Sequence, residues 1–258
     1  PTRRSSDLQQ QTLQKLASQE NREWVGKDDI PEYLSKAFVS IEDQRFYEHK
    51  GVDWKRTFGA AVHWILPGGN SYGGSTITQQ LVKNMTEDND YSVKRKVTEI
   101  MRALTLEKKV DDKDTILELY MNIIYFGKNA YGVQTASKTY FNKPVDQLDL
   151  AECALIAGLT QNPAAYNPFK YPDAAKERQK AVLYKMYEQG YISKSEYDQA
   201  VNEQLQYHEN TEAQQQKKAY SYFTDMVITD VVNDLQSQLG YSETYARSLV
   251  TSGGLSIY

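Results

Sequence analysis

Two neighbouring carboxylates, Glu42 and Asp43, follow an apolar stretch, and a histidine and a glycine come within the next eight positions. A carboxylate at the end of an apolar helix can act as a general base, because partial removal from water makes it more basic. The alternative is a solvated acid at a helix end, and these two residues alone favour that interpretation. Arg45 and His49 could share a surface with them, although a single histidine is more often structural than catalytic.

A second segment, residues 73–80, joins two glycines to hydroxyl and amide side chains at the start of a predicted helix. The backbone N–H groups at a helix N-terminus attract anions or sugar hydroxyls. The spacing of a nucleotide-binding P-loop is absent. Lys83, farther along the same helix, would add a positive charge. An ordinary capped helix is the alternative.

A third group comprises Arg95, Lys96 and Glu99, which lie near one face of a predicted helix. An ion pair of this spacing on a protein surface contributes little to stability. The group would indicate a catalytic site only if Glu99 faces Glu42 across a cleft.

The elements that must position these groups are predicted to be helices, because apolar residues recur at helical spacing and strand signals are scarce before residue 250. One helix should bury an apolar stripe of Val93, Val97, Ile100, Met101 and Leu104. A later helix should use Glu118 and Asn122 in a buried polar network that supports the cleft. The predicted helices are 28–42, 54–65, 77–84, 92–104, 112–124, 132–141, 150–159, 173–189 and one that opens with a capping box at 193–196.

The composition is that of a globular protein of 258 residues with one large domain, or one medium domain and an appendage. A net charge of -4 makes nucleic acid an unexpected partner. No segment approaches the roughly 18 consecutive apolar residues of a membrane span. The single cysteine, Cys153, stands in an apolar run and is expected to be a small buried hydrophobe.

Together, these stretches resemble the peptidoglycan glycosyltransferase domain of class A, bifunctional penicillin-binding proteins. Five motifs of that family occur in order, and the resemblance covers about residues 30–200. The matching segments are 42–51, 74–84, 95–99, 113–122 and 178–183. The last is the weakest, because Arg178 stands alone where the family often has two arginines.

The resemblance implies a mainly α fold, with a lysozyme-like helical lobe and a smaller membrane-facing jaw. It implies transfer of the growing lipid-linked glycan to the 4-hydroxyl of lipid II, with inversion and release of undecaprenyl pyrophosphate. Glu42 would be the general base, and Glu99 the second catalytic carboxylate, beside the donor. The expected substrate-binding residues are Asp43, Arg45, Phe46, His49, Gly74, Ser75, Thr76, Thr78, Gln79, Gln80, Lys83, Asn84, Arg95 and Lys96. The expected structural support comes from Lys113, Glu118, Tyr120, Asn122 and Arg178.

The resemblance also implies partners and a location. Lipid II, the nascent glycan strand and the membrane surface are the expected partners, on the extracytoplasmic face of a bacterial cell membrane. The sequence requires no cofactor, but Mg²⁺ or Mn²⁺ could assist at the pyrophosphate with Glu99 as its candidate ligand. An apolar set would touch the membrane, with packing into the core as the alternative for its helical part. Its members are Trp54, Phe58, Trp64, Ile65 and Leu66.

The expected domains are an N-terminal segment 1–27 after a missing membrane anchor, a glycosyltransferase domain 28–202, and a linker 203–258 toward a missing transpeptidase domain. Residues 1–8 are interpreted as an assembly artefact. A lytic, lysozyme-like enzyme and a non-catalytic lipid II-binding domain remain the alternatives. The cations Lys83, Arg95 and Lys96 disfavour the first, because a sugar leaving group does not need them. Two retained carboxylates beside an anionic ligand disfavour the second.

Overall fold

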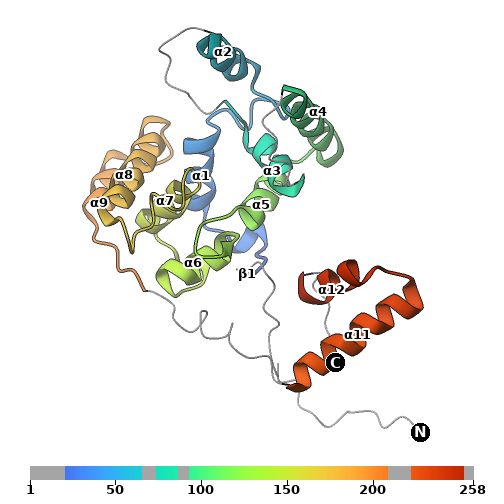
Figure 1. Ribbon diagram of the computed structural model, residues 1–258. Coiled ribbons are helices and arrows are strands. Elements are labelled where there is room, and N and C mark those ends of the chain that lie inside the picture. Colours follow the sequence, from blue (N-terminus) through green and yellow to red (C-terminus); the bar gives the residue numbers. More distant parts are fainter. Residues whose placement is uncertain (1–20, 66–73, 87–92, 209–221, 253–258) are drawn as a thin grey trace. The chain divides into compact units, whose positions relative to one another are not determined.

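The structure is a computed structural model that describes residues 21–65, 74–86, 93–208 and 222–252 (Figure 1). The chain divides into two compact units, one made of residues 22–210 and the other of residues 1–21 and 211–258. The predicted mainly α fold is confirmed, since the described strands are a single pair of two residues each. Residues 22–210 form one unit, so the division into a lobe and a jaw stays a prediction.

The larger unit contains nine of the described α-helices, two short 3-10 helices and the strand pair, which follow one another closely along the chain. In order they are β1 (Asn21–Arg22), η1 (Lys27–Asp29), α1 (Glu32–Glu42), α2 (Trp54–Ile65), α3 (Ile77–Thr86), α4 (Val93–Val110), α5 (Lys113–Ile123), β2 (Ala130–Tyr131), α6 (Val133–Phe141), η2 (Val145–Gln147), α7 (Leu150–Leu159), α8 (Pro172–Glu188) and α9 (Lys194–Asn202). Strands β1 and β2 pair with each other. The predicted capping box at the start of α9 is confirmed, because Ser193 and Glu196 bond to each other's backbone N–H groups.

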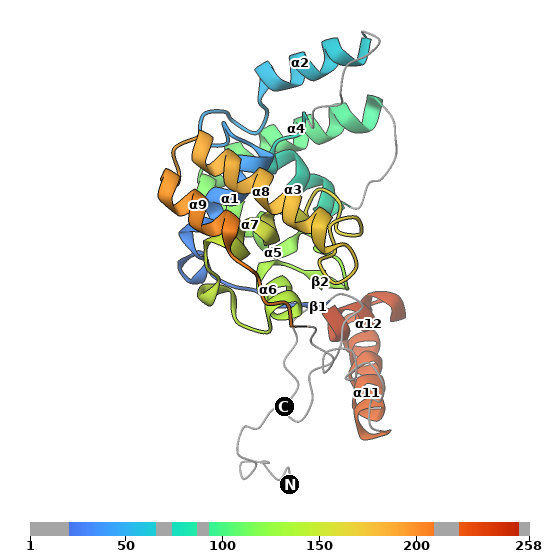
Figure 2. The same cartoon turned by 90° about the vertical axis from the view of Figure 1, so that its left-hand side faces the viewer.

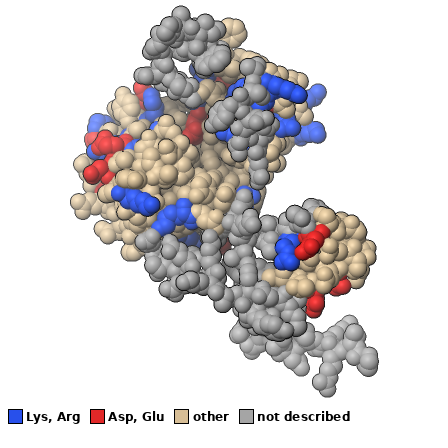
Figure 3. All heavy atoms as spheres, in the orientation of Figure 1, with Lys and Arg blue, Asp and Glu red and all other residues tan. Residues whose placement is uncertain are grey.

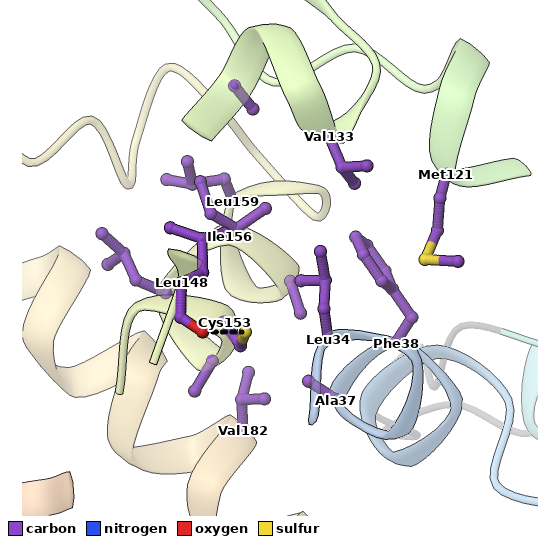
Figure 4. Close-up of a cluster of buried hydrophobic side chains, with 14 of the residues drawn as sticks. Leu34, Ala37, Phe38, Met121, Val133, Leu148, Cys153, Ile156, Leu159 and Val182 are labelled. Carbon is purple, nitrogen blue, oxygen red and sulfur yellow. Dashed lines mark hydrogen bonds between the residues drawn. The ribbon is translucent and has the colours of Figure 1, made fainter. Parts of the chain in front are cut away.

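Helix α7 lies at the centre of the core, and its residues from Ala151 to Leu159 are all buried. It packs against α1 and α8, which lie on either side of it in Figure 1, and α8 crosses the front of the unit in Figure 2. Figure 4 shows Leu34 and Phe38 of α1 pointing into the same cluster as Ile156. Burial of this apolar surface is the main force that fixes the end of α1, where Glu42 stands.

The thiol of Cys153 lies inside this core and is expected to resist alkylation in the folded protein. Burial raises the pKa of this thiol well above its ordinary value, so the reactive thiolate is scarce at neutral pH. Mass spectrometry after treatment with iodoacetamide at pH 8 should find Cys153 unmodified in native buffer and modified in strong denaturant. Complete labelling within minutes in native buffer would contradict the buried position.

The predicted apolar stripe on α4 is wrong for two of its members. Val97 is 53% exposed and Met101 is 59% exposed. The buried side chains of α4 are instead Glu99, Ala103 and Glu107, spaced by four residues. This face is turned inward because its carboxylates bond to side chains of α3, an arrangement that a hydrophobic pattern cannot indicate.

A close approach between α4 and the segment after α1 depends on Gly51. Its φ is +86°, and an added Cβ would lie 2.8 Å from the carbonyl oxygen of Ala103. We expect Gly51→Ala to lower the free energy of unfolding by about 2–4 kcal/mol, since both strain and overlap are introduced. Urea unfolding followed by circular dichroism measures this. Gly59→Ala is the matched control, because nothing lies within 4 Å of its Cβ position and alanine favours the helix. Equal stabilities of the two variants would contradict the contact.

The smaller unit contains helices α11 (Tyr222–Leu239) and α12 (Glu243–Ser252), which pack on each other. Four buried residues form its own apolar cluster: Ile228, Val232, Ala246 and Val250. The segment 203–258, predicted as a linker, therefore holds folded helices. The interpreted artefact at 1–8 lies outside the described residues. Across the described residues, none of the helices combines the length and apolarity that crossing a membrane requires.

Candidate active site

Glu42 is the last residue of α1, and hydrogen bonds from two distant parts of the chain hold its carboxylate. Its Oε2 accepts a hydrogen bond of 2.9 Å from the side-chain amide of Gln80, on α3. Its Oε1 accepts one of 2.8 Å from the hydroxyl of Thr160, directly after α7. The guanidinium of Arg56 bonds to the main-chain carbonyl of Glu42 at 2.6 Å. Sequence reasoning found Gln80 but missed Thr160 and Arg56.

The orientation of the Gln80 amide is set by Tyr120, whose hydroxyl donates to Gln80 Oε1 at 3.1 Å. Tyr120 is fully buried, and this burial, together with the negative charges of Glu42 and Asp43, raises the pKa of its hydroxyl well above the ordinary value. The group therefore stays a hydroxyl donor, and the amide must turn its N–H toward Glu42. Tyr120 thus supports the carboxylate through Gln80.

Asp43 lies next to Glu42 but points into the protein, where it is fully buried. Its Oδ2 lies 3.0 Å from Nε2 of His49 and accepts a 3.0 Å hydrogen bond from the backbone N–H of Ile77, the first residue of α3. The predicted contact of Asp43 with substrate is therefore corrected to a supporting position, whereas His49, which is only partly buried, stays a predicted substrate contact. Phe46, also predicted to bind substrate, is completely buried.

At the start of α3, backbone N–H groups are hydrogen-bonded to side chains of the protein. Thr76 and Gln79 bond to each other's backbone N–H groups at 3.0 and 3.1 Å, and the Thr76 hydroxyl donates to the Gly51 carbonyl at 2.6 Å. The N–H groups of Ile77 and Gln79, predicted to attract an anion, are thus already satisfied. Thr76, Thr78 and Gln79 are buried, which corrects their predicted contact with substrate.

Glu99 is only 5% exposed and receives hydrogen bonds from two cations and an amide. Arg95 donates to its Oε2 at 2.8 Å, Lys96 donates to its Oε1, and the Gln79 amide donates to Oε1 at 3.2 Å. Lys96 also donates to the Ser75 hydroxyl at 2.9 Å. The carboxylate therefore fixes two cations in place and neutralises part of their charge.

A shallow pocket beside this cluster is lined by cations from α3 and α4. Lys83 is exposed at its rim, and Arg102, which sequence reasoning missed, lies one helical turn beyond Glu99. The complete lining is Val82, Lys83, Thr86, Arg95, Glu99 and Arg102. Figure 3 shows Lys and Arg side chains gathered over α4 on this face. The charge of the pocket suits an anionic group.

The fit of a divalent metal ion to Glu99 is poor, because Arg95, Lys96 and Gln79 already occupy both of its carboxylate oxygens. Among the residues that the structure describes, three or more His, Cys, Asp or Glu side chains do not come together in a group that could hold a metal. A metal ion at Glu99 therefore stays a prediction, and no step below uses one.

A second buried carboxylate of α4, that of Glu107, bonds to side chains of α3 and α5. Its Oε1 accepts hydrogen bonds from the Thr78 hydroxyl at 2.5 Å and from the Lys113 ammonium at 2.6 Å. The Lys113 ammonium also lies 4.4 Å from the centre of the Phe46 ring. Burial lowers the pKa of Lys113, while Glu107 opposes that shift. The predicted supporting residue Lys113 thus connects α5 with α3 and α4 through a glutamate that sequence reasoning missed.

The other predicted supporting residues also make internal contacts. The Asn122 amide bonds to both the N–H and the carbonyl of Val25, at 2.9 and 2.8 Å. Glu118 accepts a 3.3 Å hydrogen bond from the indole of the exposed Trp24, so its predicted place in a buried network is wrong, whereas Asn122 is buried. Arg178 donates to the Gly158 carbonyl at 3.2 Å. Burial lowers the pKa of the Arg178 guanidinium, and the charge of Glu42 opposes that shift.

Arg45, which is predicted to bind substrate, uses two of its guanidinium nitrogens in an ion pair with Asp53. Its Nε and Nη2 donate to the two carboxylate oxygens of Asp53 at 3.0 and 2.8 Å. Asp53 also accepts from the backbone N–H of Arg56, in the first turn of α2. The structure thus gives Arg45 a structural role in joining the loop after α1 to α2.

Helix α2 exposes part of the predicted apolar set. Trp54 is 55% exposed and Phe58 is 73% exposed, so packing into the core is wrong for these two. The side chains of Trp64, Ile65 and Leu66 lie outside the described residues. Two large exposed apolar side chains lie one helical turn apart here, and contact of this face with the membrane stays a prediction.

Comparison with known proteins gives concordant matches. The transglycosylase family model matches residues 9–187. The chain is 41% identical over 261 residues to penicillin-binding protein 1A of Clostridium botulinum strain Langeland, covering 96% of this chain and 31% of that protein. It is 41% identical over 228 residues to penicillin-binding protein 1F of Bacillus subtilis, covering 88% and 32%. The crystal structure of penicillin-binding protein 1A from Haemophilus influenzae aligns with a TM-score of 0.46 and 25% identity, over 87% of this chain and 23% of that one. The chain therefore spans about a third of the length of the curated relatives that it matches.

Proposed function

This chain belongs to the transglycosylase family, and we propose that its candidate site polymerises the glycan chain of peptidoglycan. Membership of the family bears out the resemblance inferred from the five motifs. One observation carries the assignment of roles: the adjacent residues Gln79 and Gln80 of α3 bond to Glu99 and to Glu42 respectively. A single helix thereby ties a candidate base to a cluster of cations, the two components that transfer from a phosphate leaving group requires.

On the acceptor side, Glu42 takes the proton from the 4-hydroxyl of lipid II. The oxygen then attacks the anomeric carbon of the growing glycan from the face opposite the leaving group, so the configuration inverts. The bond between that carbon and the pyrophosphate oxygen breaks, and its electron pair leaves with undecaprenyl pyrophosphate. Glu42 is the only group that must change its protonation state, and Gln80 and Thr160 hold it in place.

On the donor side, positive charge stabilises the pyrophosphate as it departs. Lys83, Arg95 and Arg102 line the pocket, and Glu99 fixes Arg95 and the neighbouring Lys96 in position. Cations that are already in place do not have to reorganise as negative charge develops, which lowers the barrier. Glu99 therefore acts on the reaction through the cations it holds.

The same proposal includes the position of the site relative to the membrane and the further parts of the protein. The substrate carries a lipid, so the exposed Trp54 and Phe58 would lie toward the membrane surface, on the extracytoplasmic face where lipid II is used. A membrane anchor and a transpeptidase domain in the same protein are part of this proposal, because the chain corresponds to about a third of its relatives.

Incubation of the purified chain with fluorescently labelled lipid II in detergent or vesicles tests the function. Polymer that lysozyme digests, together with released undecaprenyl pyrophosphate, is the expected result. Shortening of purified glycan strands without synthesis would favour a lytic enzyme. Binding of lipid II by a folded chain, with neither synthesis nor cleavage, would favour a binding domain.

A further inference from the structure

The hydroxyl of Thr160 has two hydrogen-bond acceptors within reach. It lies 2.8 Å from Oε1 of Glu42 and also 2.8 Å from the main-chain carbonyl of Ala157, one turn earlier in α7. A threonine hydroxyl has a single hydrogen and two acceptor lone pairs, so it donates to one of these oxygens at a time. The hydrogen bond to Ala157 is local, whereas the bond to Glu42 spans 118 positions of sequence.

This geometry suits both protonation states of Glu42. While Glu42 is a carboxylate, the Thr160 hydrogen points to it and stabilises its charge. Once Glu42 carries a proton on Oε1, that proton can be donated to Thr160 Oγ1, and the threonine hydrogen turns to the Ala157 carbonyl. The two oxygens stay hydrogen-bonded in either state, so the carboxyl group keeps its position while its charge changes.

The other partner of Glu42 lacks this ability. The Gln80 nitrogen can only donate, and the hydroxyl of Tyr120 fixes the amide in that orientation. Gln80 therefore suits the charged carboxylate alone. Among the two side-chain partners that the structure gives Glu42, Thr160 is the one that can also accept a proton from it.

We propose that Thr160 is a positioning residue that holds Glu42 in both protonation states of the transfer reaction. This inference rests on the proposed function. Thr160 undergoes no net proton transfer: the proton moves from the acceptor hydroxyl to Glu42, and the threonine hydrogen only changes its direction.

Steady-state polymerisation of labelled lipid II by Thr160→Val and Thr160→Ser tests the proposal. Valine replaces the hydroxyl with a methyl group of similar size, so kcat should fall by about 10- to 100-fold, as expected for loss of a hydrogen bond to a charged group. KM should stay within about twofold of the parent, because Thr160 acts on Glu42. Thr160→Ser, which keeps the hydroxyl, should retain most of the parental kcat. Thermal melting of all variants shows whether they are folded.

A double variant shows whether Thr160 affects the rate through Glu42 or independently of it. In a Glu42→Gln background, Thr160→Val should cause little further loss, since residues that act as a unit are not additive. An equal loss in both backgrounds would overturn the proposal, and so would equal impairment of the serine and valine variants. An active parent with a fully active Thr160→Val would overturn it while leaving the function intact. A folded parent that makes no polymer would instead refute the function.

Discussion

Replacing Glu42 with glutamine is expected to lower the turnover of lipid II by about 1,000-fold, with little change in binding. Glutamine has almost the shape of glutamate and can keep a hydrogen bond with Gln80 or Thr160, but it cannot take up the proton of the attacking hydroxyl. Initial rates at saturating labelled lipid II measure the loss, and binding of lipid II to the variant measures the affinity.

The matched control is Glu48→Gln, which removes an exposed acid in the segment that follows α1. Its rate should equal that of the parent, because Glu48 is exposed and makes no contact with the candidate base. The two variants change the net charge by the same amount, so a difference in rate isolates the role of Glu42. A Glu42→Gln protein that retains a tenth of the parental rate would show that another group removes the proton.

The second large effect is expected at Lys83. Its side chain is exposed at the rim of the pocket, so Lys83→Gln should leave the fold intact and lower kcat by about 100-fold through loss of charge at the leaving group. Lys83→Arg keeps the positive charge and should lose less. Rates measured at several concentrations of lipid II separate an effect on kcat from an effect on KM.

Lys94→Gln serves as the control for Lys83, because Lys94 is exposed on α4 and does not line the pocket. It should retain the parental rate. Similar losses in the two lysine variants would indicate that general attraction of an anionic substrate, and not a charge aimed at the leaving group, explains the effect. Added salt would then reduce the parental rate steeply.

The helices of the larger unit were predictable because their signals are local. The apolar spacing before Glu42, the N-cap at Asp112 and the capping box at Ser193 each lie within one or two turns of the element that they define. The placement of Glu42 at the end of α1 follows from the same short-range pattern. The family motifs then pointed to Gln79, Gln80 and Glu99 as site residues.

The contacts that complete the candidate site were not predictable from local patterns. Thr160 is 118 positions from Glu42, and it stands in an unremarkable turn after an apolar helix. In the sequence, Glu107 does not differ from the other charged residues of α4, and only the structure shows that Thr78 and Lys113 bond to it. Such pairs arise from how helices pack, and a single sequence carries no periodic signal for them. The same reason explains why Asp43, a neighbour of the base, proved to be a buried cap.

The adjacency of Gln79 and Gln80 also couples two contacts to the position of one helix. Successive side chains on a helix point about 100° apart, so one helix serves Glu42 with one residue and Glu99 with the next. Any substitution that rotates or shifts α3 moves both contacts together. A displacement of α3 would therefore disturb the candidate base and the cation cluster at once, whereas the bond from Thr160 to Glu42 does not depend on this helix.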